Sequence, residues 1–191
     1  MRVIWGVAII TTPVSSISSY ALGYNIEVDL EYVANTTVNN AGICRAACIA
    51  SISNYRKSTS YTALSIYNAL SLVYSGTPVG NSTWIERGYL YCNMSYTGAG
   101  TLDVDELYSA LHADRPVIFR VYRTDTDGTL KGHAVVLKAI SQNRYSSVYT
   151  FMDPNYDSDY YAIFNGTDCD SDDFVYINAD NTYDQWIYST Y

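Results

Sequence analysis

The spacing of apolar and polar positions changes several times along the chain, and each spacing predicts an element. Residues 26–32 read IEVDLEY, where apolar and acidic side chains alternate as in a strand with one face in water. A polar loop over 34–42 leads to a helix over 44–55, whose small and apolar residues suit tight packing in a core. A second helix is predicted over 61–74, with apolar residues at every third or fourth position and Ser60 as its N-cap.

The second half of the chain becomes richer in strands. Residues 76–83 (GTPVGNST) break the helical pattern, and a helix over 101–114 follows, with acids in its first turn where the helix dipole favours them. Strands are predicted over 116–123, 133–140 and 145–153. Helices thus precede strands, which predicts an α+β fold with an N-terminal helical lobe packed against a C-terminal antiparallel sheet lobe.

The last two of these strands place two chemically useful side chains together. The short polar link SQNR between them favours an antiparallel hairpin. If its turn centres near Asn143, His133 at the start of one strand lies opposite Asp153 at the end of the next. A shift of one residue in the turn would change this pairing.

Charge is unevenly distributed along the 191 residues, whose net charge is −8. Residues 151–191 contain nine aspartates and no lysine, arginine or glutamate, so nearly all the negative charge lies there. This acidic end, without any long basic patch, argues against nucleic acid as a partner. No apolar run approaches the length of a membrane span.

The N-terminal residues 1–23 allow more than one interpretation. One arginine, an apolar run and then small residues resemble a short signal peptide or the remnant of a propeptide, whereas Val, Ile and Trp before Pro13 also suit a first strand. Residues 24–191 are expected to form the domain itself. With a signal, the protein would be secreted or lie on the cell surface; otherwise it would be cytoplasmic. Asn-x-Ser/Thr triplets occur at Asn35, Asn81, Asn93 and Asn165, but they do not decide between these.

Cys44 combines two features that activate a thiol. It lies at the start of a predicted helix, whose free N–H groups lower a thiol pKa, and a docked sheet lobe would bring His133 beside it. Asp153 would then orient the imidazole. The Cys44 N–H, with the side-chain amide of Asn39 or Asn40, would bind the oxyanion.

These residues carry a resemblance to a known family. GICRAACIASISNYRK, then GHAVVLKAI and YTFMDPN, in this order over residues 26–155, resemble a papain-like cysteine peptidase. The branch it resembles is bacterial, with a helix that opens Cys-Trp-Ala-Ala-Cys, as in staphopain-type enzymes and the leader peptidase domains of bacteriocin exporters. The resemblance implies Cys44 as nucleophile, His133 as base, Asp153 as orienting acid, a peptide or protein substrate, and no cofactor.

Two departures from the family pattern keep alternatives open. Arg45 stands where an aromatic residue usually follows the nucleophile, and Val38 stands where the oxyanion glutamine usually lies. Both are compatible with an inactive, peptide-binding module of the same fold. An acyl or amide transferase would use the same three groups. Asn155 competes with Asp153 as the orienting residue.

The remaining cysteines and acids suggest no second site. Cys48, one helical turn after Cys44, is expected to pack in the core, with a disulfide as the alternative, while Cys92 and Cys169 have no assigned partner. The cysteines and histidines lack the paired spacing of a zinc site, so no metal site is expected. Asp168, Asp170 and Asp172 begin like a calcium loop, but Asp173 and Ala179 replace its glycine and glutamate, which favours a solvated acidic loop. His112, near a helix end, is not expected to be catalytic.

Overall fold

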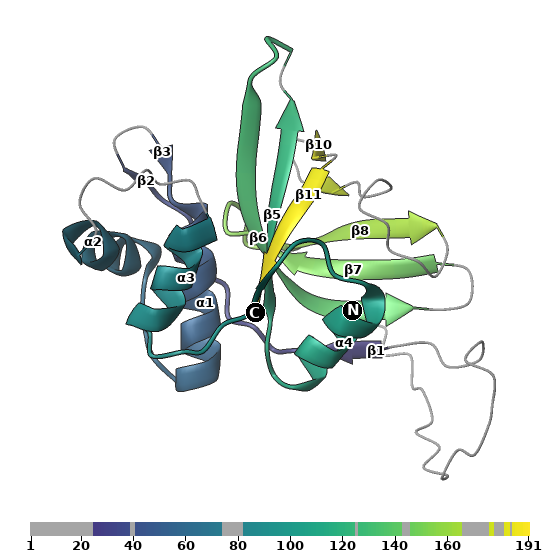
Figure 1. Ribbon diagram of the computed structural model, residues 1–191, viewed down its shortest axis with the longest axis horizontal. Coiled ribbons are helices and arrows are strands. Elements are labelled where there is room, and N and C mark those ends of the chain that lie inside the picture. The colour runs from purple at the N-terminus through teal and green to yellow at the C-terminus, as the bar shows by residue number, and fades with distance from the viewer. Residues whose placement is uncertain are drawn as a thin grey trace.

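The protein is described here by a computed structural model (Figure 1). The described residues are 25–38, 41–73, 82–124, 126–142, 146–165, 176–177, 182–183 and 185–191. The predictions for residues 1–23 and for Cys169 and the acidic loop around it lie outside this part of the chain. Among the described residues, no helix has the length and apolar character needed to cross a membrane.

Three helices form a lobe on one side of the molecule (Figure 1). They are α1 (Cys44–Lys57), α2 (Ala63–Val73) and α3 (Ser82–Tyr91), and both α2 and α3 pack on α1. Every residue of α1 from Ala46 to Asn54 is buried, as its small and apolar sequence predicts. α1 is therefore the central helix of the lobe, and its first residue lies where the helical lobe meets the sheet.

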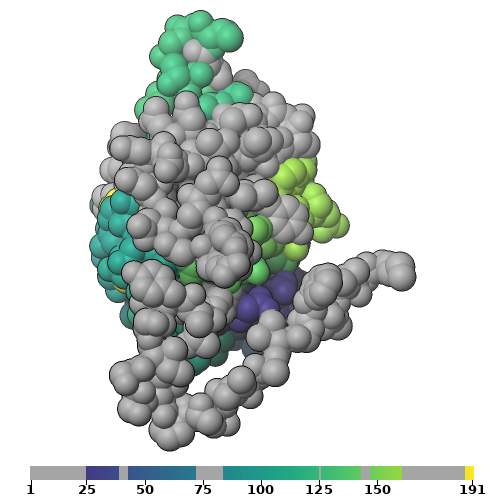
Figure 2. Space-filling view, turned by 90° about the vertical axis from the view of Figure 1, so that its right-hand side faces the viewer, coloured from purple at the N-terminus to yellow at the C-terminus, as the bar shows by residue number. Residues whose placement is uncertain are grey.

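The other lobe is a nine-stranded antiparallel sheet with the strand order β10-β9-β8-β7-β6-β5-β11-β4, in which β1 also pairs with β6. α4 (Val104–His112) packs beside β1, β5 and β6. The β5–β6 hairpin rises from the sheet, and its far end projects beyond the surrounding surface in Figure 2. The strands are β1 (Asn25–Glu27), β4 (Gly98–Ala99), β5 (Val117–Thr124), β6 (Leu130–Gln142), β7 (Ser146–Met152), β8 (Asp159–Asn165), β9 (Tyr176–Ile177), β10 (Thr182–Tyr183) and β11 (Gln185–Thr190). This arrangement confirms the predicted α+β fold.

Some local predictions were wrong in extent. The strand predicted over 26–32 is only β1, because after Val28 donates its N–H to Lys138 O (2.8 Å) the chain leaves the edge of β6. The predicted loop over 34–42 contains a small two-stranded sheet, β2 (Thr37–Val38) with β3 (Ala41–Gly42). These short strands stand directly before α1.

The helical lobe brings two further corrections. α2 begins at Ala63, and Thr62 rather than Ser60 caps it, since the Thr62 hydroxyl accepts the Ser65 N–H (3.1 Å). The Thr62 N–H in turn donates to the Ser65 hydroxyl (2.9 Å), which makes the cap reciprocal. α3 was not predicted, although its buried residues recur with helical spacing. These are Trp84, Ile85, Gly88 and Tyr89.

The register of the β6–β7 hairpin differs from the prediction. Gln142 pairs with Ser147 near the turn, and the register shifts at a β-bulge between Leu137 and Ala139, beyond which Val136 pairs with Met152. Continuing this pairing places Asp153, just past β7, opposite Val135. His133 is therefore not directly opposite Asp153, as predicted, but one diagonal step away on the same face.

Candidate active site

Cys44 is the first residue of α1, and its position is fixed by the segment before the helix. The N-cap residue Ile43 makes no side-chain cap bond to the first-turn N–H groups. The Ile43 N–H itself donates to Thr36 O (3.0 Å), which anchors the start of the helix to the strand segment before it. Cys44 is half-buried, so its thiol lies at the boundary between core and solvent.

His133 lies in β6, buried at the side of the sheet that meets α1. Its Nε2 is 2.8 Å from Asp153 Oδ1. The buried carboxylate accepts from the ring, which fixes a proton on Nε2 and leaves Nδ1 as the ring atom available to the thiol. Asp153 Oδ1 also accepts the Asn155 N–H (2.9 Å).

The thiol and imidazole are electrostatically coupled. Burial raises the pKa of Cys44, but the hydrogen bond and charge of His133 lower it, as do the charge of Arg45 and the Ala134 backbone, and the net pKa is lowered. Burial likewise lowers the pKa of His133, yet hydrogen bonds to Asp153 and Cys44, with the charges of both, raise it to about 10. Both directions favour a thiolate beside an imidazolium.

The next cysteine along the helix has the opposite environment. Cys48 is fully buried, its Sγ donates to Ala134 O (3.4 Å), and burial raises the pKa of its thiol well above the ordinary value. Cys44, Cys48 and Cys92 are all free thiols. This environment agrees with the expected packing of Cys48 in the core. The alternative, a disulfide at Cys48, does not form.

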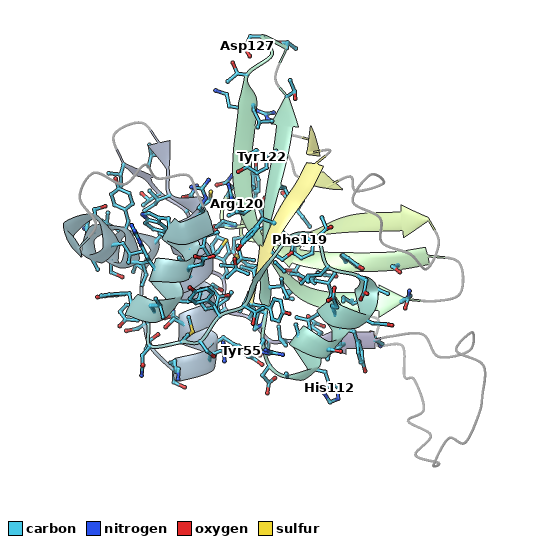
Figure 3. The ribbon with its side chains drawn as sticks, viewed as in Figure 1. Tyr55, His112, Phe119, Arg120, Tyr122 and Asp127 are labelled. Atoms are coloured by element: carbon cyan, nitrogen blue, oxygen red, sulfur yellow. The ribbon has the colours of Figure 1, made fainter. Side chains whose placement is uncertain are left out.

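The remaining predicted residues fall in different places. Asn39 and Asn40, the predicted oxyanion donors, lie outside the described residues. Asn155 Oδ1 accepts from Asn35 Nδ2 (2.7 Å), whereas the side chain that bonds to His133 Nε2 is that of Asp153. His112 is exposed at the end of α4, at the opposite end of the molecule from Asp127 at the tip of the β5–β6 hairpin (Figure 3), and its ring is 6.0 Å from that of Tyr108. Within the described part of the chain, no cluster of His, Cys, Asp and Glu side chains could hold a metal ion.

Two residues near the site went unnoticed in the sequence. The Tyr32 hydroxyl donates to Pro154 O (3.2 Å), and the Asn35 N–H donates to the same oxygen (2.6 Å). Both residues contact the turn that carries Asp153 from more than a hundred positions earlier in the chain. No sequence pattern marks this contact, and Asn35 attracted notice only as part of an Asn-Thr-Thr triplet.

Comparison with known proteins identifies the family and the fold of the chain. The family model described as Peptidase C39 like family matches residues 25–181. A solved structure, described as that of a C39-like peptidase from Bacillus anthracis, is similar with a TM-score of 0.53 and 12% identity, over 88% of this chain and 97% of that chain. At that identity the similarity shows the papain-like α+β fold alone. No curated protein matches the chain. Because the family model spans most of its length, the chain belongs to the Peptidase C39 like family, within the papain-like cysteine peptidase superfamily.

Proposed function

We propose that this chain is a cysteine peptidase in which Cys44 is the nucleophile, His133 the general base and acid, and Asp153 the orienting group. The observation that carries the proposal is the hydrogen bond of 2.8 Å from His133 Nε2 to the buried Asp153 carboxylate, with the thiol of Cys44 bonded to the same ring. A buried carboxylate, an imidazole and a thiol at a helix start form the arrangement that nucleophilic acyl chemistry needs. The first residues of this helix, Cys44-Arg-Ala-Ala-Cys48, resemble the Cys-Trp-Ala-Ala-Cys opening of the bacterial branch. This supports the proposal that the chain is related to staphopain-type enzymes and bacteriocin leader peptidases.

The reaction proceeds through an acyl-enzyme. The Cys44 thiolate adds to the scissile carbonyl carbon, and the imidazolium of His133 transfers a proton to the leaving amine as the C–N bond breaks. The product is a thioester on Cys44 and a neutral imidazole. His133 then takes a proton from water, the resulting hydroxide attacks the thioester, and the acid product leaves as the thiolate and imidazolium form again.

The oxyanion of each tetrahedral intermediate needs donors beside Cys44. We assign its own backbone N–H as one, because the first N–H groups of a helix have no partner within the helix. The side-chain amide of Asn39 or Asn40 is proposed as the second. Arg45 occupies the position where the family usually has an aromatic residue. Its positive charge helps to lower the pKa of Cys44.

The first test measures the rate at which iodoacetamide alkylates Cys44 between about pH 5 and pH 9, read by peptide mass. In the wild type Cys44 is expected to react well below the ordinary thiol pKa of about 8.5, and His133→Ala should abolish this reactivity. His112→Ala removes the only other histidine and serves as the matched control. Cys48, buried with a raised pKa, should stay unmodified at pH 6.

A second test separates hydrolysis from the alternatives. Unstructured peptides are incubated with the wild type and with Cys44→Ala, and new termini are identified by mass spectrometry. Cleavage that requires Cys44 supports the peptidase. A thioester that passes to an added amine faster than to water would indicate a transferase instead. Low-pH alkylation without turnover of any peptide or acyl donor would favour a binding module, and the absence of low-pH alkylation would refute the proposed site.

A further inference from the structure

A network of hydrogen bonds holds the turn that carries Asp153. Pro154 O accepts two donors from the segment before the nucleophile helix, the Asn35 N–H (2.6 Å) and the Tyr32 hydroxyl (3.2 Å). The Asn35 side chain adds a third bond, from its Nδ2 to Asn155 Oδ1 (2.7 Å). Asn155 in turn donates its N–H to Asp153 Oδ1 (2.9 Å). The two residues that directly follow Asp153 are therefore bonded to this segment.

The same segment also holds the start of the nucleophile helix. Asn35 Oδ1 accepts the Thr36 N–H (2.9 Å), which fixes the amide so that its Nδ2 faces Asn155. Thr36 O accepts the Ile43 N–H (3.0 Å), directly before Cys44. One short segment thus bonds both to the residue before the thiol and to the turn that carries the carboxylate.

Such a link matters because Asp153 lies outside the strand pairing. β7 ends at Met152, so the residue that contacts His133 lies beyond the paired positions of the strand. A hydrogen bond of 2.8 Å between a ring and a carboxylate weakens steeply when either group moves. The bonds of the turn itself therefore matter for the position of the carboxylate, and one of them joins the Tyr156 N–H to Asp153 O (3.1 Å).

We propose that Asn35 and Tyr32 are positioning residues that hold the Asp153 turn in register with the start of α1. They act through the turn, and the inference rests on the proposed function of Cys44, His133 and Asp153. Asn35 contributes most, because it bonds to two residues of the turn and also to Thr36. Tyr32 contributes one hydroxyl, which donates to Pro154 O.

The test compares Asn35→Ala, Asn35→Asp and Tyr32→Phe with the wild type. Asn35→Asp keeps the acceptor for the Thr36 N–H but loses the donor to Asn155, so it should behave like Asn35→Ala. Tyr55→Phe is the matched control. It removes a hydroxyl that donates to Asp114 (3.0 Å), near the C-terminal end of α1 and away from Cys44 (Figure 3). Melting temperatures establish that each variant is folded.

The readouts are the pH midpoint of Cys44 alkylation and the separate values of kcat and KM for a peptide that the wild type cleaves. A looser carboxylate stabilises the imidazolium less, so the midpoint should move to higher pH in both Asn35 variants. We expect kcat to fall about tenfold in these variants with KM nearly unchanged, and a smaller fall in Tyr32→Phe. Tyr55→Phe should match the wild type in all three quantities.

The outcomes separate this inference from the function on which it rests. If the wild type shows low-pH alkylation and the folded Asn35 variants keep the same midpoint and kcat, the positioning role is wrong while the peptidase site stands. An equal change in Tyr55→Phe would show a general effect of stability and would also refute it. If the wild type itself shows no low-pH alkylation, the proposed function fails first, and the positioning role with it.

Discussion

Replacing the buried carboxylate by its neutral isostere separates charge from shape at the site. In Asp153→Asn the side-chain oxygen still accepts from His133 Nε2 and from the Asn155 N–H, but the negative charge is lost. A hydrogen bond to a charged group contributes about 1.5–3 kcal/mol, and 1.36 kcal/mol corresponds to one pKa unit. The pKa of His133, now raised in part by Asp153, should therefore fall by about one to two units.

The thiol follows the ring, because the charge and hydrogen bond of His133 lower the pKa of Cys44. The midpoint of iodoacetamide alkylation should rise by about one to two pH units, and the rate below both midpoints should fall by about 10- to 100-fold. Asp153→Ala removes the acceptor as well and should lower the rate further.

The control removes a carboxylate from the same loop without touching the ring. Asp157 is exposed four residues later, and Asp157→Asn should leave the alkylation profile of Cys44 unchanged. An unchanged profile in Asp153→Asn, or an equal shift in Asp157→Asn, would show that the carboxylate does not govern the thiol–imidazole pair. The reasoning from the hydrogen bond of 2.8 Å would then be refuted.

Three further predictions concern pH and stability. The pH–rate profile for peptide cleavage should be a bell, rising as Cys44 ionises below its ordinary pKa and falling near pH 10 as His133 loses its proton, which steady-state kcat/KM values would reveal. Gly88→Ala would push a Cβ into the side chain of Ile49, so calorimetry should show a loss of about 1–3 kcal/mol, partly restored by Ile49→Val in the double variant. Asp103→Ala removes a capping box at α4 and should cost about 1 kcal/mol in urea unfolding, with peptide cleavage unaffected.

The sequence predicted what depends on neighbours along the chain. The helix that begins at Cys44 follows from its run of small and apolar residues, and the helix from Val104 follows from its acidic first turn. The closeness of His133 and Asp153 followed from the short link between two adjacent strands. The predicted register was wrong, but the predicted contact still forms. His133 and Asp153 are diagonal neighbours on one face of the sheet, and their side chains are long enough to meet.

What the sequence did not predict depends on contacts between distant segments. α3 went unpredicted because Gly88, a poor helix former, stands among its buried residues. The close approach of Ile49, which leaves no room for a Cβ at this position, is visible only in three dimensions. Tyr32 and Asn35 reach Pro154 and Asn155 across about 120 residues, and neither side chain differs in type from those of an ordinary surface loop.

The bulge in β6 decides whether an acid and a base meet at all. Side chains alternate between the faces of a sheet, so the number of residues between two strand positions, odd or even, determines whether they share a face. If Lys138 were paired in a regular ladder instead of bulging, Asp153 would fall opposite Val136, whose side chain points away from the face that holds His133. Cys44, His133 and Asp153 could then all be present and in order, and yet His133 and Asp153 would not meet. A relative can therefore keep every expected letter of the motif and still lack the site, and the bulge within β6 is the feature that distinguishes the two.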